Sequence, residues 1–268
     1  MHRFSVAVLA CVLVISIGGC SASPAATAPT ELPILVLDPE EPDPEALAAL
    51  FLGDGLSRQE GATPDDTRAI FARGDVAVWI GPGELTYLAG EPREPVTVTL
   101  DEARGIALAF LNDTIGLPDD VVQVERVGAV MAEELDSSGP GTPYSYSIEW
   151  QRVIDGVPVA GAQWIRVEVS ESGVVSQLHR RWHRVLSEGE AIRMQPPDEI
   201  IDIAAGLKGG SCPDHSAEPT AEDVAAARLV YHVPFTGDQH LMIPAWEVTA
   251  SDGEQYYFHA GTGAALDW

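Results

Sequence analysis

The chain reads YSYSIEWQ at Tyr144–Gln151, and this stretch decides the expected fold. Aromatic or aliphatic side chains alternate with serine, glutamate and glutamine, and successive residues of an extended chain point to opposite faces. A period of two is typical of an antiparallel strand whose sheet buries one face and exposes the other. The stretch therefore predicts an antiparallel sheet that is buried on one side.

Strand and turn signals on both sides of this stretch extend the predicted sheet. Val121–Met131 before it is rich in β-branched residues, and Asp155–Gly156 after it is a hairpin signal. Ile165–Ser170 alternates again, Ser172–Gly173 marks a second turn, and Val174–Leu186 is a further predicted strand. We expect these segments to pair as consecutive antiparallel strands.

The clearest predicted helix begins at a capping box, Thr99–Glu102. There the hydroxyl of Thr99 and the carboxylate of Glu102 can each accept a hydrogen bond from a backbone N–H group. The apolar residues that follow keep to one helical face, and Gly116–Pro118 ends the segment. This face is expected to cover the buried side of the sheet.

The order of one helix followed by antiparallel strands recurs toward the C-terminus. Pro197–Leu207 predicts a short helix, and strand-like runs follow at Leu229–Val233, Ile243–Ala250 and Glu254–Ala260. A helix at Pro44–Phe51 and a hairpin over 75–89 form a looser third version. The pattern predicts an α+β fold of repeated helix plus antiparallel β-sheet units.

The first twenty residues carry a secretion signal. Arg3 precedes the uncharged run Phe4–Ile17, which is too short for a comfortable membrane span and is typical of a signal peptide. Gly18 and Gly19 before Cys20 resemble the lipobox of bacterial lipoproteins. That resemblance implies cleavage before Cys20, acylation of its thiol, and attachment to the cell membrane on the extracytoplasmic face. The alternative is an ordinary signal peptide with an incidental cysteine.

These signals divide the chain into five predicted segments. They are a lipoprotein signal peptide at 1–19, a lipid-anchored flexible tether at 20–43, a helix and hairpin region at 44–98, an α+β lobe at 99–190 and a second α+β lobe at 191–268. The tether is rich in small residues and proline, with an extended piece at Ile34–Leu37.

The charge of the chain restricts its partners. It contains 15 lysine and arginine residues against 41 aspartate and glutamate residues, a formal net charge of −26. Such a protein repels nucleic acid, so no nucleic-acid partner is expected. Solubility is the simplest interpretation of the acidity. Beyond Cys11 and Cys20, only Cys212 remains, which leaves no intramolecular disulfide after cleavage.

Three stretches of the sequence resemble a known family. Val153–Ala162 reads VIDGVPVAGA, Ile243–Val248 reads IPAWEV, and the segment 252–263 reads DGEQYYFHAGTG. These are similar to motifs of PepSY/FTP-type propeptide domains and of YycI/YycH-like regulatory proteins, in pieces over 99–268. His259 departs from the pattern, because the family usually has aspartate there. The resemblance implies a helix against a curved antiparallel sheet, without catalytic residues, that acts on a protease or a sensor kinase.

Motifs for catalysis and cofactor binding are absent from the sequence. It has no H-E-x-x-H, no G-x-S-x-G and no phosphate-binding G-x-x-x-x-G-K-[ST] pattern. Cys212 and His215 form one C-x-x-H pair without a second pair nearby, which favours a surface loop over a metal site. We therefore expect no enzymatic activity, no metal and no cofactor.

One concentrated basic stretch stands out in the acidic chain, HRRWHR at His179–Arg184. The candidate partner-binding residues within it are Arg180, Arg181, Trp182 and Arg184. A partner would dock on the arginines with the tryptophan as an anchor. The alternative, which the sequence favours, is that the arginines neutralise acidic neighbouring strands.

The sequence as a whole predicts a non-catalytic, membrane-anchored extracytoplasmic lipoprotein. Its expected role is to bind or regulate an envelope protein such as a sensor kinase or a protease. Two alternatives remain open: a lipoprotein that binds a small ligand or cation, and an enzyme with an unrecognised site.

Overall fold

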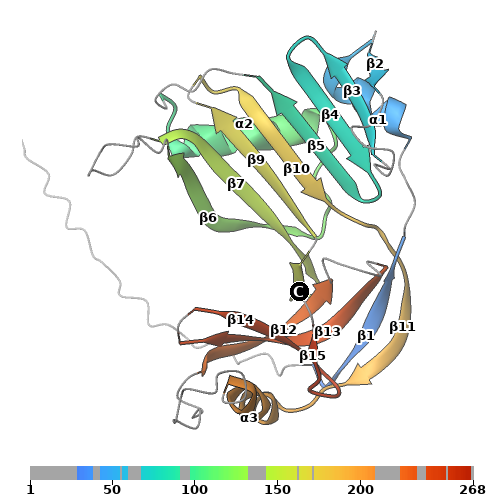
Figure 1. Cartoon of the computed structure of the whole chain (residues 1–268), viewed down its shortest axis with the longest axis vertical. Coiled ribbons are helices and arrows are strands. Elements are labelled where there is room, and N and C mark those ends of the chain that lie inside the picture. The colour runs from blue at the N-terminus through green and yellow to red at the C-terminus, as the bar shows by residue number, and fades with distance from the viewer. Residues whose placement is uncertain are drawn as a thin grey trace, which may run out of the picture. The chain divides into compact units, whose positions relative to one another are not determined.

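The computed structural model describes residues 29–38, 43–54, 56–59, 68–90, 97–131, 143–161, 163–170, 172–208, 224–233, 240–251 and 253–266. Within these ranges the chain forms three helices and fifteen strands, and nearly all strand pairs are antiparallel (Figure 1). The described residues from Glu31 onward belong to one compact unit. This architecture confirms the α+β class predicted from the alternating stretches.

One run of neighbouring strands has the order β2-β3-β4-β5-β10-β9-β7, with β6 on the other side of β7, and every pair in it is antiparallel. Its strands are β2 (Ser57–Gln59), β3 (Ala69–Arg73), β4 (Val76–Gly81), β5 (Glu84–Ala89), β6 (Val121–Met131), β7 (Pro143–Ile154), β9 (Trp164–Ser170) and β10 (Val175–Arg181). The stretch that decided the fold lies in β7, between β6 and β9.

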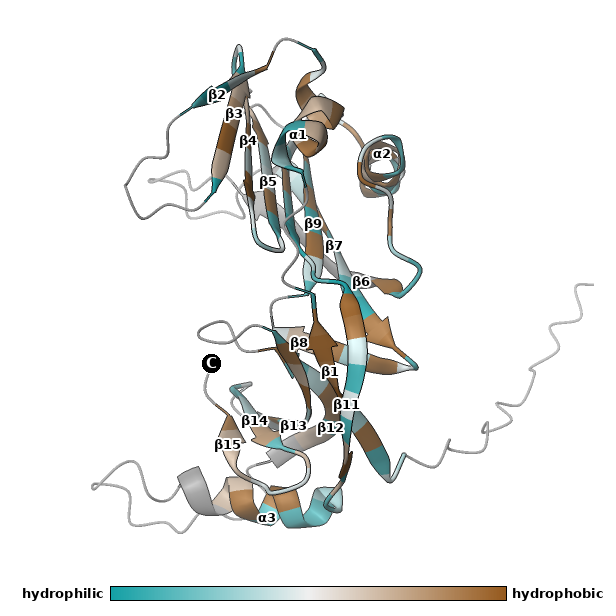
Figure 2. Cartoon of the chain, turned by 90° about the vertical axis from the view of Figure 1, so that its right-hand side faces the viewer, coloured by the Kyte–Doolittle hydropathy of each residue, from teal (hydrophilic) through white to brown (hydrophobic). Residues whose placement is uncertain are grey.

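Two helices, α1 (Pro44–Leu52) and α2 (Leu100–Asp113), pack on one face of this run (Figure 2). Both begin at the predicted caps. The side chain of Asp43 accepts from the first turn of α1, and Thr99 and Glu102 form the complete capping box of α2. Buried aliphatic and aromatic residues from both helices and six strands meet in one core cluster. The helix and hairpin region predicted at 44–98 therefore shares its core with the segment that follows it.

A second run of strands has the order β11-β1-β13-β12-β8, and β13 also pairs with β14, which pairs with β15. Its elements are β1 (Glu31–Leu37), β8 (Val157–Gly161), β11 (Val185–Arg193), α3 (Pro197–Lys208), β12 (Val224–Val233), β13 (Leu241–Ala250), β14 (Gln255–His259) and β15 (Ala265–Leu266). Asp155 and Gly156 turn β7 into β8 with φ of 50° and 83°. This hairpin joins the two runs, and β8 then pairs in parallel with β12.

The structure differs from the predicted tether at Glu31–Leu37. These residues form β1, which pairs with β11 and β13, and its leucines at 32, 35 and 37 are buried. The proline-rich and acidic flanks of this segment gave it the composition of a linker, but its leucines fill a core. The predicted boundary between 190 and 191 is also crossed, because β11 continues from Val185 to Arg193.

The turn after β14 explains why histidine can stand at the position where the resembling family has aspartate. Nδ1 of His259 accepts hydrogen bonds from the backbone N–H groups of Gly261, at 3.1 Å, and Thr262, at 3.2 Å. A side-chain acceptor that holds its own turn in this way is the usual role of aspartate or asparagine. The imidazole therefore supplies the same acceptor.

Several predicted features lie outside the described residues. They are the signal peptide, Cys20, Cys212 and most of the tether before Glu31. Within the described part of the chain, none of the helices combines the length and the apolar character that a membrane crossing requires.

Candidate functional site

A cavity of about 630 Å³ lies beside the end of β10. Its walls come from the end of β1, the start of α1, the turn between β4 and β5, the segment before β6, and the residues that follow β10. The lining residues are Asp38, Asp43, Leu47, Gly81, Gly83, Glu84, Leu85, Pro118, Asp120, Arg152, Arg180, Trp182, His183 and Arg184. The basic stretch singled out in the sequence therefore forms one wall of this cavity.

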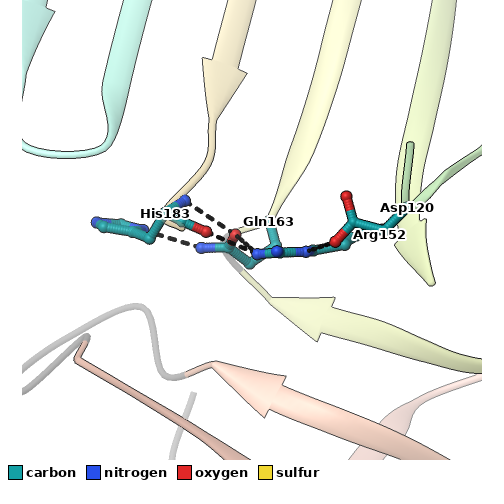
Figure 3. A network of polar contacts seen from close by, with 4 residues as sticks. All are labelled: Asp120, Arg152, Gln163 and His183. Atoms are coloured by element: carbon teal, nitrogen blue, oxygen red, sulfur yellow. Dashed lines mark hydrogen bonds and ion pairs between the residues drawn. The ribbon is translucent and has the colours of Figure 1, made fainter. Parts of the chain in front are cut away.

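Arg152 is the centre of a polar network in this wall (Figure 3). Its Nε donates to Asp120 Oδ2 at 2.6 Å, and its Nη1 donates to the His183 carbonyl at 2.7 Å and to Gln163 Oε1 at 3.1 Å. The guanidinium also lies 4.7 Å from the ring centroid of Trp182. Burial lowers the pKa of Arg152, and the ion pair with Asp120 opposes that shift. The network holds the segment after β10 against β7.

The same network fixes the tautomer of His183. Gln163 Oε1 accepts from Arg152 and from the His183 backbone N–H, so the amide group of Gln163 donates to Nδ1 of His183 at 2.9 Å. The ring proton must then be on Nε2. The ring packs against the turn between β4 and β5, where a Cβ on Gly83 would lie 2.1 Å from Nε2. A glycine at 83 therefore leaves room for the imidazole.

The stability of the protein is expected to depend on the charge of His183. Burial is the main cause that lowers the pKa of His183; the neighbouring side chains of His240, Arg152 and Arg180 lower it further, and Glu84 opposes the shift. The folded protein keeps this ring neutral at a pH where the unfolded chain, with an ordinary pKa near 6.5, takes up a proton. The contribution to the free energy of unfolding is therefore present above about pH 6.5 and is lost as the pH falls.

Replacing His183 with asparagine keeps an acceptor for Gln163 and removes this titration. We expect urea unfolding between about pH 7.5 and pH 5 to give a flatter dependence of stability on pH in His183→Asn than in the wild type. Equal slopes in the two proteins would contradict this assignment.

The structure separates the candidate partner-binding residues instead of presenting them on one face. The predicted strand over 174–186 is interrupted, because β10 ends at Arg181 and β11 begins at Val185. Arg181 pairs with Glu84 on the neighbouring strand, and Arg184, whose side chain is 70% exposed, pairs with Asp38. Both of these arginines therefore pair with acidic side chains of neighbouring segments, which is the alternative that the sequence favoured.

Trp182 and Arg180 have different surroundings. Trp182 is 8% exposed and belongs to the core cluster, so its ring is not displayed as an anchor in this structure. Arg180 lines the cavity, and its side-chain Nε is buried without a hydrogen-bond partner among the described residues. It is the member of the predicted set that neutralisation does not explain.

Sequence reasoning missed Asp120, Arg152, Gln163 and Gly83. Asp120 belongs to the acidic pair Asp119–Asp120, which has the composition of an exposed turn, and Gln163 follows the glycine-rich motif without a signal of its own. Arg152 did have a signal, because it continues the inward-facing series of β7 two residues after the buried Trp150. An arginine at an inward position of an alternating strand indicates a buried polar site.

A second candidate surface is the outer edge of β11. Among the described strands, β11 pairs with β1 alone, and its residues 186–191 are exposed. Leu186 is 58% exposed. Gly189 lies at an irregularity in the pairing, opposite Ile34, which bends this edge. The edge therefore presents backbone N–H and C=O groups that no described strand satisfies.

No group of three or more histidine, cysteine, aspartate or glutamate side chains is arranged to hold a metal ion within the described ranges. Cys212 and His215, the pair considered from the sequence, lie outside those ranges.

Comparison with known proteins supports the fold. No protein-family model and no curated protein matches the sequence. The crystal structure of an uncharacterized protein from Eubacterium rectale ATCC 33656 is similar over 89% of this chain and 87% of its own, with a TM-score of 0.52 and 11% identity. The two proteins share a fold of the mixed α+β class with a large antiparallel sheet system. The C-terminal domain of Bacillus megaterium YpeB aligns over 84% of this chain and 94% of its own, with a TM-score of 0.42 and 14% identity.

Proposed function

We propose that the chain is a non-catalytic, lipid-anchored module on the extracytoplasmic face of the cell membrane, and that it binds and regulates an envelope protein. The observation that carries the proposal is the outer edge of β11. An exposed edge strand can accept an extended segment of another protein as an additional strand, with main-chain hydrogen bonds supplying the affinity.

The charges along β11 specify the kind of segment that would pair there. Glu188 and Glu190 are exposed on this strand, and acidic side chains on an edge discourage non-specific strand pairing. A partner segment with basic residues opposite these positions would compensate them across the new strand pair. We therefore expect an extended basic segment.

The anchoring and the class of partner rest on the sequence. The lipobox-like residues before Cys20 support lipidation there. The motifs at Val153–Ala162 and 252–263 support two PepSY-like lobes, which act in that family on proteases or sensor kinases. On these resemblances, we propose that the partner at the edge of β11 is a protease or a sensor kinase of the cell envelope.

The experiment places a photocrosslinking amino acid at Leu186 of the full-length protein in its native membranes. A matched control carries the same amino acid at Leu50 on α1, which is 51% exposed. We expect Leu186 to crosslink one defined envelope protein and Leu50 not to crosslink it. The purified partner should then bind the wild type and lose affinity for a variant with lysine at 188 and at 190.

Two results would contradict the proposal in different parts. Equal crosslinking from Leu186 and Leu50, or unchanged affinity in the lysine variant, would remove the edge of β11 as the binding surface. A Cys20→Ser variant that remains as firmly in the membrane fraction as the wild type would remove the lipid anchor.

A further inference from the structure

Arg180 lies in a row of residues across the sheet whose other members are apolar core residues. In β10 it follows Leu178, which is fully buried, by two residues, so the two side chains leave the same face of the sheet. The cross-strand register places Arg180 beside Ile165 and Leu85. The remaining members of this row, read across the sheet, are Trp150, Ile80 and Ala69, and all of them are buried.

The guanidinium of Arg180 has nothing to compensate its charge among the described residues. Its Nε is buried without a hydrogen-bond partner. Burial alone lowers the pKa of Arg180, with no carboxylate that opposes the shift. Arg180 is half-buried, and a cation that is partly removed from water is stabilised by a counter-charge and hydrogen bonds. An anion that enters the cavity would supply both.

The carboxylates that line the same cavity are engaged elsewhere. Asp120 pairs with Arg152, Asp38 pairs with Arg184, Glu84 pairs with Arg181, and Asp43 accepts from the backbone at the start of α1. Each of them already accepts a hydrogen bond or ion pair from a group other than Arg180. The open volume in front of the guanidinium is also large enough for an organic ligand, since pockets for such ligands span roughly 300–1,000 Å³.

We infer that this cavity binds an organic carboxylate, whose two oxygens pair with the Arg180 guanidinium while its apolar portion contacts Leu47, Leu85 and Trp182. The planar fork of arginine matches a carboxylate in two parallel hydrogen bonds. A doubly charged phosphate is disfavoured, because the acidic side chains around the cavity would repel its second charge. This site is separate from the edge of β11 and does not depend on the function proposed for that edge.

Calorimetric titration of the full-length protein tests the site with defined probes. N-acetyl-leucine is the carboxylate probe, N-acetyl-leucinamide is its neutral match, and inorganic phosphate at equal ionic strength is the competing anion. We expect the acid to bind and the amide to bind about tenfold or more weakly, because it lacks the charge-assisted pair. An equal response to the amide or to phosphate would overturn the inference.

Two variants locate the binding. Arg180→Leu should bind the acid about tenfold or more weakly, whereas Arg166→Leu, on the other face of the same sheet, should bind it as the wild type does. Without ligand, Arg180→Leu should be at least as stable as the wild type, since leucine suits an apolar row and removes an uncompensated charge. A marked loss of stability in Arg180→Leu, or undiminished binding by it, would overturn the inference.

The source of the carboxylate is distinguished by a second pair of probes. A pentapeptide that ends in leucine with a free C-terminus is compared with its C-terminal amide. If N-acetyl-leucine binds and neither pentapeptide does, the cavity is assigned to a small organic acid. Binding of the pentapeptide acid, but not of its amide, assigns it to the terminus of a protein chain.

Discussion

Replacing Gly161 with alanine is expected to lower the free energy of unfolding by about 4 kcal/mol. Gly161 has a φ of +91°, and a Cβ added there would lie 2.1 Å from the carbonyl oxygen of Val233. The substitution therefore combines an unfavourable backbone conformation with a clash against the neighbouring strand. Because Val233 pairs with Gly161 in the parallel contact between β8 and β12, relief of the clash must separate these strands.

Gly156 supplies the matched control for Gly161. It also has a positive φ, +83°, but no described atom lies within 4 Å of the position that its Cβ would occupy. Gly156→Ala should therefore cost only the backbone part, about 1–2 kcal/mol. Urea unfolding of both variants measures the two free energies of unfolding. Equal losses in the two variants would show that the clash with Val233 does not destabilise the protein.

Replacing Arg152 with alanine is expected to destabilise the protein by about 3 kcal/mol, at the lower end for a broken buried ion pair. The change removes the side-chain donor to the His183 carbonyl and one of the two donors to Gln163 Oε1, and it removes the guanidinium from the face of Trp182. Asp120 is one-third exposed, so water compensates part of its loss. The segment between β10 and β11 should loosen, which hydrogen exchange of its amides would detect.

Arg166 offers a control of the same chemistry at the surface. It pairs with Glu149 at 2.8 Å and lies 4.9 Å from the ring centroid of Trp164, but its side chain is 43% exposed. Exposed ion pairs contribute about 1 kcal/mol or less. Arg166→Ala should therefore cost clearly less than Arg152→Ala in the same unfolding experiment. If both variants lost a similar free energy of unfolding, the larger effect expected for the buried ion pair of Arg152 would be contradicted.

Local patterns predicted the elements of this fold well. The capping box at Thr99–Glu102 depends on residues close in sequence, and it is present as expected. The stretch Tyr144–Gln151 lies in a strand with Ile148 and Trp150 buried as expected, but Ser145, on the face predicted to be exposed, is buried as well. Pairing between distant segments was harder to predict. No residue near β1 in the sequence indicates that β1 will pair with residues 185–193 and 241–242. Its composition therefore suggested a tether.

The candidate site was predicted in part for a related reason. The basic stretch at His179–Arg184 drew attention to the correct wall, but whether each arginine meets an acid depends on the tertiary contacts. Arg181 and Arg184 find partners, and Arg180 does not. The inward phase of Arg152 and Arg180 in their strands was available from the sequence. If the alternation of inward-facing residues in β7 and β10 is continued past the last apolar residue, it reaches Arg152 and Arg180.

The placement of β1 determines the order in which the two parts of this chain can assemble during synthesis. The buried residues of the first core cluster all lie between Ala48 and Trp182, so they are complete once about two-thirds of the chain is made. The cluster that contains β1 also needs residues as late as Met242. The apolar side chains of β1 are thus made early and buried late, and contacts at such long sequence separation form slowly. Over that interval the apolar side chains of β1 lack the strands that bury them in the folded protein.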